Sequence, residues 1–312
     1  MKKTSETQLH HDSAELHVTG KAVYVNDMEV SGQTLCGKVV YSPHAHAQII
    51  RCDVGKARML KGVHAVLTYK DIPGANQMGP VAHDEPCLAE KEVCAIGQAV
   101  ALIAAENEEI ALEAEKSITI TYKPLKPILD IKTARAADSK IAPTRNMERG
   151  DISKAFKKST HILSGELHTG AQEHWYLEAQ SALCVPGEGR EMMVYASSQN
   201  PSETQAIVAE VLGISKKEVV CEVRRMGGAF GGKETQGNHV AAWAAVLANA
   251  TRKPVAVHLF RDDDQKITGK RHPFQNNYQV AFDDSGRLLA LKAHLYADGG
   301  AAAGRQPMFT GA

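Results

Sequence analysis

Along the first 130 residues, short runs with the two-residue alternation or continuous apolar character of strands are mixed with runs that have helical spacing. Apolar or alternating runs predict strands at 35–41, 47–52, 63–68, 98–105 and 117–122. Helical spacing predicts helices at 54–60 and 106–116, the second with Ile110 and Leu112 among acidic residues. We therefore expect a self-contained unit of mixed strands and helices.

The pattern changes after residue 124. The stretch from Pro124 to Gly150 contains three prolines and little hydrophobic period, which predicts a connector. A second unit then begins near Asp151. Its predicted strands are 160–168, 192–197, 218–224 and 255–260, with a hairpin of 278–282 and 288–296. A helix is predicted from Ser202, with Gln205 in the capping-box position, to Gly213, and another over 238–250.

The segment from Arg225 to Thr235 holds four glycines within six residues, between a predicted strand and a predicted helix. Such a loop lets backbone N–H groups approach a ligand closely, next to a helix N-terminus that favours negative charge. Gly227 to Lys233 reads G-x-x-x-x-G-K, the phosphate-loop pattern, but Glu234 stands where that loop needs Ser or Thr. The dinucleotide spacing G-x-G-x-x-G is also absent. The loop is therefore a glycine-rich cradle that ends in a carboxylate.

Charge and cysteine content exclude or disfavour several functional classes of protein. Lys+Arg and Asp+Glu both number 36, so the formal charge of zero gives no support for nucleic-acid binding. No apolar run is long enough to span a membrane, and the polar stretch from Met1 to Asp12 does not resemble a secretory signal. None of the six cysteines forms C-x-x-C, so iron–sulfur and structural zinc sites are not expected. Cys36 and Cys221 lie in strand-like runs, which indicates buried thiols in a reducing cytoplasm.

Other groups have two interpretations each. His44 and His46 form H-x-H, which a strand would place on one face as in some metal sites, but without a recognisable third ligand structural histidines are favoured. The segment 172–178 either lines a site or packs its aromatic residues. Gln199 ends a strand and could make one directed hydrogen bond; taken alone, a turn residue is favoured. Asp262–Asp264 does not have calcium-loop spacing, so a solvated acidic turn is favoured.

Six blocks, in this order, resemble the molybdenum-binding portion of the molybdenum hydroxylase (xanthine oxidase) family. They are His17–Ala22, Ser42–Ala47, Gln172–Glu178, Ser198–Asn200, Arg225–Thr235 and Gly269–Phe274. Each block alone is weak, whereas the ordered set is specific and covers nearly the whole chain. The resemblance implies an α+β fold: an α/β-hammerhead domain at 1–130, a linker at 131–150, and the N-terminal part of a molybdopterin-binding domain at 151–312.

The resemblance also implies roles for individual residues. The cofactor-binding residues would be Gln199, Gly228, Ala229, Phe230 and Gly231. Among these, Gln199 resembles the glutamine that hydrogen-bonds toward the molybdenum oxo ligand, and Phe230 resembles the residue beside the metal and its pterin; neither would be a direct ligand. Ala229 stands where the family more commonly has glycine. Glu234 resembles the glutamate that hydrogen-bonds a purine, and members acting on simple aldehydes usually lack that carboxylate.

The implied cofactor is molybdenum held by molybdopterin through dithiolene sulfurs rather than by protein side chains. The implied reaction hydroxylates purines, hypoxanthine and xanthine to urate, with water as the oxygen source, within a cytoplasmic, multi-subunit xanthine dehydrogenase. Electrons would leave through 2Fe-2S clusters to FAD on partner subunits. No nucleic acid or membrane is expected as a partner.

The family's catalytic glutamate lies beyond residue 312, so no general base can be assigned in this sequence. The Gly- and Ala-rich tail from Asp298 to Ala312 has no terminating structure, and we expect a chain cut within a domain and inactive alone. One alternative is an aldehyde oxidoreductase of the same family, against which Glu234 counts. The others are a non-catalytic nucleotide-binding module using Gly227 to Lys233 and a non-catalytic scaffold.

Overall fold

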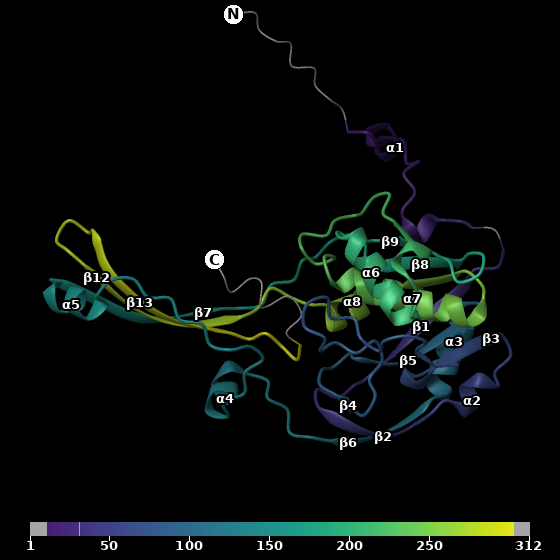
Figure 1. The fold of residues 1–312 in the computed structure, drawn as a ribbon, viewed down its shortest axis with the longest axis horizontal. Helices are drawn as coiled ribbons and strands as arrows, with labels where there is room; N and C mark the ends of the chain where they lie inside the picture. The colour runs from purple at the N-terminus through teal and green to yellow at the C-terminus, as the bar shows by residue number, and fades with distance from the viewer. Residues whose placement is uncertain (1–10, 31, 303–312) are drawn as a thin grey trace, which may run out of the picture.

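The computed structural model describes residues 11–30 and 32–302 (Figure 1). Its α-helices are α1 Ala14–Val18, α2 Gly55–Arg58, α3 Glu108–Ser117, α4 Ile131–Ala136, α5 Ile152–Lys158, α6 Pro201–Leu212, α7 Gln236–Thr251 and α8 Arg261–Ile267. Its strands are β1 Leu35–Tyr41, β2 Ala47–Asp53, β3 Val63–Leu67, β4 Glu92–Val93, β5 Ala99–Ala105, β6 Thr119–Pro124, β7 His161–Thr169, β8 Ser181–Pro186, β9 Met192–Ala196, β10 Val219–Glu222, β11 Val255–His258, β12 Phe274–Phe282 and β13 Leu288–Ala297. The predictions for residues 1–10 and for the tail beyond residue 302 lie outside the described range.

A seven-stranded sheet joins early and late parts of the chain. Its strand order is β10-β9-β8-β11-β1-β5-β3, and β1 pairs in parallel with β11, with Leu35 opposite Val255. Every residue of β5 is buried. Leu102 packs in one core cluster with α7, while Ile103 packs in another with residues of α3, so the strand is covered on both faces. This explains why its sequence is a continuous apolar run rather than an alternating one. The domain boundaries at 130 and 150 stay a prediction.

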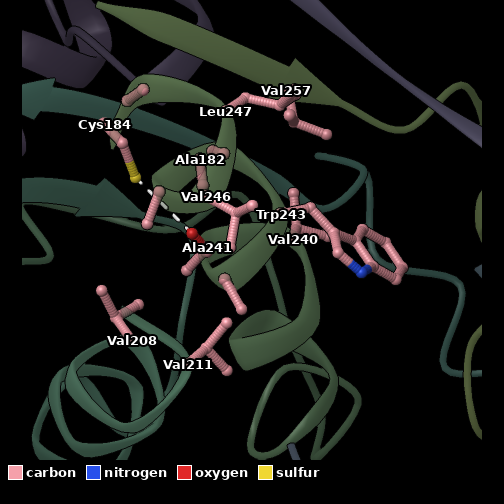
Figure 2. Packing of buried hydrophobic residues seen from close by; sticks show 14 of the residues in the cluster. Ala182, Cys184, Val208, Val211, Val240, Ala241, Trp243, Val246, Leu247 and Val257 are labelled. Carbon is pink, nitrogen blue, oxygen red and sulfur yellow. Dashed lines mark hydrogen bonds between the residues drawn. The ribbon is translucent and has the colours of Figure 1, made fainter. Parts of the chain in front are cut away.

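Helix α7 lies at the centre of the larger core cluster (Figure 2). Alanine dominates its buried face, and small side chains let the helix backbone lie close to the sheet and to α6. The Cys184 thiol of β8 donates a hydrogen bond to the Ala241 carbonyl at 3.5 Å. On the other side, the Trp243 indole N–H donates to the Cys87 carbonyl at 3.0 Å. This core supports the strand and helix ends that flank the glycine loop.

Two smaller sheets are also present in the described part of the chain. One has the order β13-β12-β7 and extends away from the body of the molecule together with α5 (Figure 1). The predicted hairpin is confirmed, because β12 and β13 pair in antiparallel fashion from Phe274 opposite Ala297 to Phe282 opposite Leu288. The other sheet has the order β4-β2-β6 and lies at the bottom of the molecule in Figure 1, below β1 and β5 of the large sheet.

The start of α6 differs from the prediction. The helix begins at Pro201 and its N-cap is Asn200, whose side chain accepts from the Glu203 backbone N–H at 3.3 Å. The predicted capping box of Ser202 and Gln205 is wrong, since the Gln205 amide instead donates to the carbonyls of Lys216 and Val219. Proline is favoured in the first helical turn because it has no N–H group that would need a partner there. The helix therefore starts at Pro201, one residue before the predicted start.

The cysteine prediction was also partly wrong. Cys36 and Cys221 lie in strands β1 and β10 as expected, but both are only half-buried. The fully buried thiols are Cys87 and Cys184, and burial raises the pKa of each. Within the described part of the chain, no helix is both long and apolar enough to cross a membrane.

Candidate functional site

The glycine loop connects β10 to α7 and folds back on the segment at 172–178. Phe230 and Gly231 have left-handed backbones, with φ of +53° and +89°. Glycine adopts such a conformation without steric cost. At Gly232 the requirement is space, because an added Cβ would lie 2.7 Å from a ring atom of Tyr176. The inner side of the loop therefore packs against an aromatic ring that only a glycine can approach so closely.

Gln199 holds the loop through two hydrogen bonds to one residue. Its backbone N–H donates to the Lys233 carbonyl at 2.9 Å, and its side-chain Oε1 accepts from the Lys233 N–H at 3.1 Å. Gln199 follows the end of β9, where the chain turns into α6, and its side chain is exposed. Because Oε1 faces the loop, the Nε2 amide group is the part of this side chain that can donate to a ligand. The structure thus brings together two of the predicted blocks.

Lys233 points into the protein rather than toward a ligand. Its side chain is 0% exposed, and its Nζ lies 3.0 Å from Glu178 Oε2 and 2.8 Å from Ser197 Oγ. Nζ also lies 4.6 Å from the centre of the Tyr176 ring, which adds a cation–π contact. Burial lowers the pKa of the Lys233 ammonium, while the adjacent Glu178 acts in the opposite direction. A phosphate-loop lysine must reach its phosphate, so this arrangement counts against the nucleotide-binding alternative.

Glu178 is the centre of the network under the loop. One oxygen, Oε2, accepts hydrogen bonds from the Gly227 N–H at 2.8 Å and the Ser197 hydroxyl at 2.7 Å, in addition to Lys233. The other oxygen, Oε1, is buried without a hydrogen-bond partner among the described residues. A carboxylate with three donors on one oxygen fixes the first glycine of the loop to the end of β9.

A second layer of buried polar groups lies beneath this network. Asp264 of α8, only 1% exposed, accepts from the Tyr176 hydroxyl at 2.6 Å and from the Gln180 N–H at 2.9 Å. The Gln180 amide in turn donates to the Gly232 carbonyl at 3.1 Å. Burial and the hydrogen bond to Asp264 raise the pKa of Tyr176, which keeps the phenol a donor. The predicted solvated turn at 262–264 is therefore wrong for Asp264, which is a structural acceptor inside a helix.

The outer side of the loop is open. Phe230 is 74% exposed, and nothing lies within 4 Å of the position where Gly231 would carry a Cβ. Ala229 is buried, and Glu234 is half-buried immediately before Thr235, the N-cap of α7. The predicted cofactor-binding residues thus share one loop and its Gln199 partner, with the protein core on one side and open space on the other.

The sequence of 172–178 left two interpretations open, lining a site or packing in the core, and its residues differ in this respect. Tyr176 and Glu178 support the loop from below, whereas Trp175 and Leu177 are exposed. Sequence reasoning missed Glu178 as the partner of Lys233, although a lysine in a glycine loop without a Ser or Thr after it already indicates that its charge is used elsewhere.

The fold and the loop define an α+β protein whose site offers an amide, backbone N–H groups and an aromatic ring. Residues 134–312 match the family described as the molybdopterin cofactor-binding domain, and residues 19–126 match the a/b hammerhead domain of aldehyde oxidase and xanthine dehydrogenase. The chain belongs to this molybdopterin cofactor-binding family, with a hammerhead domain preceding the molybdopterin-binding domain. The predicted fold class is confirmed.

Similar proteins include both kinds of enzyme that the family name covers. The chain is 44% identical over 292 residues to the xanthine dehydrogenase of Dictyostelium discoideum, covering 94% of this chain and 21% of that protein. It is 41% identical over 292 residues to aldehyde oxidase 3 of Mus musculus, covering 93% and 22%. The aldehyde oxidoreductase structure from Desulfovibrio gigas matches with a TM-score of 0.81 and 26% identity, over 91% of this chain and 33% of that one. The chain spans about a fifth of the length of these curated relatives.

The residues at the loop fit a molybdopterin cofactor. Among the described residues, the one group of three potential metal ligands is His46, Glu92 and Cys94, none of which belongs to the loop. The described residues of the loop form no such group, which suits a metal that is held by the sulfurs of a pterin dithiolene. The open outer side next to Gly231 and the available Gln199 amide suit an organic group that accepts hydrogen bonds.

Proposed function

We propose that this chain forms part of a purine hydroxylase that converts hypoxanthine and xanthine to urate, with water as the oxygen source. The observation that supports this proposal is Glu234, a carboxylate that follows the buried Lys233 in the loop held by Gln199. A carboxylate accepts N–H hydrogen bonds, which a purine ring can donate and a simple aldehyde cannot. Since relatives of both kinds match at 44% and 41% identity, Glu234 rather than overall similarity favours the purine.

The cofactor in this proposal is molybdenum–molybdopterin, which when bound supplies the two-electron oxidation. The residues that would hold it are Gln199, Gly228, Ala229, Phe230 and Gly231. Gln199 would donate a hydrogen bond through Nε2, since its Oε1 accepts from the Lys233 N–H. The exposed Phe230 ring would lie against the bound group and exclude water. Neither Gln199 nor Phe230 would ligate the metal directly.

The remaining parts of the proposed enzyme lie outside this chain. The general base is expected from residues beyond 312, and the 2Fe-2S clusters and FAD from partner subunits of a cytoplasmic xanthine dehydrogenase. The purified chain alone would then be inactive. Xanthine turnover by the 312-residue chain with no added polypeptide would contradict this part of the proposal.

The substrate proposal is tested with Glu234→Gln in the complete enzyme. Glutamine keeps a carbonyl acceptor but loses the charge, and the change from a charged to a neutral hydrogen bond costs about 1–1.5 kcal/mol, so kcat/KM for xanthine should fall roughly 5- to 12-fold. Turnover of a simple aldehyde should stay nearly unchanged, because an aldehyde offers no N–H group. The matched control is Glu115→Gln, because the Glu115 carboxylate of α3 pairs with the Lys38 ammonium of β1 at 3.6 Å, in the first half of the chain. Equal losses for both substrates, or a wild-type enzyme that oxidises aldehydes and not purines, would favour the aldehyde oxidoreductase instead.

A further inference from the structure

The pairing of β2 with β4 has one face turned into the protein and one turned outward. Ala47 lies opposite Val93, and both side chains are 0% exposed in a small core cluster. Side chains alternate between the faces of a sheet, so the neighbours of this pair point the other way. Along the same register, Gln48 lies opposite Glu92. The buried pair therefore fixes the position of the outward-facing side chains around it.

Three residues next to the buried pair place potential metal ligands together: Glu92 in β4, and His46 and Cys94 directly outside the two strands. His46 Nε2 lies 2.6 Å from Glu92 Oε1, and Cys94 Sγ lies 3.8 Å from the same oxygen. All three ligand atoms lie within 4.8 Å of one another. In a tetrahedral zinc site, two ligand atoms are separated by about 3.3–3.6 Å, as bond lengths of about 2.0–2.3 Å require. The separations in this cluster bracket that range, and the exposed Glu92 side chain can rotate to make up the difference.

Backbone and side-chain contacts hold two of these groups in place. His46 Nδ1 donates to the Lys126 carbonyl at 3.3 Å, which leaves Nε2 facing Glu92. Histidine ligands of metals typically donate their other ring N–H in this way, and the contact fixes the ring orientation. The Cys94 backbone N–H donates to Gln98 Oε1 at 2.8 Å, which anchors the residue that carries the thiol. The cluster therefore has the supporting contacts of a metal site.

We propose that His46, Glu92 and Cys94 bind a divalent transition-metal ion, with Zn²⁺ the best match. Imidazole nitrogen, carboxylate oxygen and thiolate sulfur are the three ligand types that zinc uses in proteins. The ion takes the place of the proton between His46 Nε2 and Glu92 Oε1, and the Cys94 thiol loses its proton on binding. Three protein ligands leave the fourth position to water. His44, the other histidine of the H-x-H pair, packs against Tyr122 with ring centroids 4.7 Å apart and ring planes tilted by 60°, and takes no part.

The site is independent of the proposed molybdenum chemistry. It shares no residue with the glycine loop or its supporting network, and its three residues come from the first 94 positions of the chain. Failure of this proposal would therefore leave the purine proposal unchanged, and the reverse also holds. The prediction of structural histidines covers both His44 and His46; this proposal keeps it for His44 and replaces it for His46.

The first test is metal titration of the purified full chain, with Zn²⁺ by calorimetry and Co²⁺ by absorption spectroscopy. We expect one ion per chain and a sulfur-to-cobalt charge-transfer band. His46→Gln, Glu92→Gln and Cys94→Ser should each weaken binding at least about tenfold, and Cys94→Ser should abolish the band. The matched control is His64→Gln, because His64 pairs with Glu106 at 3.6 Å without a thiol in the group. Equal binding by wild type and Cys94→Ser, or no sulfur band, would overturn the proposal.

A second measurement does not depend on variants. Cys94 is the exposed cysteine among the six, so iodoacetamide should alkylate it fastest in the free protein. Only the free thiolate is a good nucleophile, so Zn²⁺ should slow alkylation of Cys94 at least about tenfold, and a chelator should reverse the effect. The half-buried Cys52 provides an internal control in the same peptide map, and its rate should not respond to Zn²⁺. Alkylation of Cys94 at the same rate with and without the ion would contradict the proposal.

Discussion

The buried Lys233–Glu178 pair makes a sharp prediction for Lys233→Met. The lysine is 0% exposed and its carboxylate partner 12% exposed, so removal of the ammonium leaves a negative charge in a largely buried position. Methionine fills a similar volume, so the change tests charge rather than packing. The remaining partners of Glu178, the Gly227 N–H and the Ser197 hydroxyl, are not charged.

The magnitude follows from the cost of an uncompensated buried charge. Breaking one side of a buried ion pair costs about 3–5 kcal/mol, whereas replacing both sides with neutral groups is often close to neutral. We therefore expect Lys233→Met to lose about 3–5 kcal/mol of unfolding free energy. Adding Glu178→Gln should restore at least about 1 kcal/mol, because contacting residues show coupling energies of about 0.5–3 kcal/mol. The phosphate-loop interpretation predicts the opposite: a stable protein that loses nucleotide.

The assay is urea unfolding of the wild type, Lys233→Met, Glu178→Gln and the double variant. Their unfolding free energies are compared provided that the m value, the dependence of that free energy on urea concentration, is the same for all four. Lys217→Met serves as the control, since Lys217 is exposed and such a change usually alters stability by less than about 0.5 kcal/mol. A loss below about 1 kcal/mol for Lys233→Met, or additive effects of the two substitutions, would refute the argument that this pair supports the loop.

Two further predictions concern the layer beneath the loop. Asp264→Ala should cost about 2–4 kcal/mol in urea unfolding, because it leaves the Tyr176 hydroxyl and the Gln180 N–H buried without an acceptor; a loss below about 1 kcal/mol would contradict this. Burial lowers the pKa of the His174 imidazole below its ordinary 6.5, so the unfolded state binds a proton at a higher pH than the folded state. The free energy of unfolding of the wild type should therefore decrease as pH falls through this range, and the decrease should be smaller in His174→Gln. Parallel stability–pH curves between about pH 7.5 and 5.5 would show that His174 makes no such contribution.

The hydrophobic pattern predicted much of the fold because the burial of several strands, on one face or on both, is visible in their own sequences. The run ending at Ala105 is apolar at every position, as expected of a strand covered on both faces. The hairpin of β12 and β13 was found through its turn, Asp283 to Gly286. Strand β8 was missed because its apolar run is bounded by Ser181 and Pro186, and a short apolar run does not by itself distinguish a strand from a buried helical segment. The parallel pairing of β1 with β11 could not be predicted, since no local pattern identifies a strand's partner far along the chain.

The sequence located the glycine loop but not the distant side chains that contact it, and the functional roles assigned to the loop residues stay predictions. Glycine spacing located the loop, and Gln199 was found as a residue able to make a directed hydrogen bond. The partner of Lys233 lies 55 residues earlier, and only folding brings the two together. The same is true of His46, whose neighbour Glu92 lies 46 residues later. Local sequence specifies which backbone conformations are accessible, whereas the destination of a charged side chain depends on distant groups.

The inward direction of the Lys233 side chain limits what the loop can bind. The lysine's charge is neutralised inside the protein by Glu178, so the loop offers an external ligand backbone N–H groups and the N-terminus of α7, but no side-chain cation from its G-K pair. A triphosphate needs that cation and meets a carboxylate instead. Under the purine proposal, an uncharged ring with N–H donors would have the opposite preference, because the Glu234 carboxylate would accept its hydrogen bonds. The buried ion pair thus removes from the loop the side-chain cation that a phosphate loop requires, although the sequence is close to that pattern.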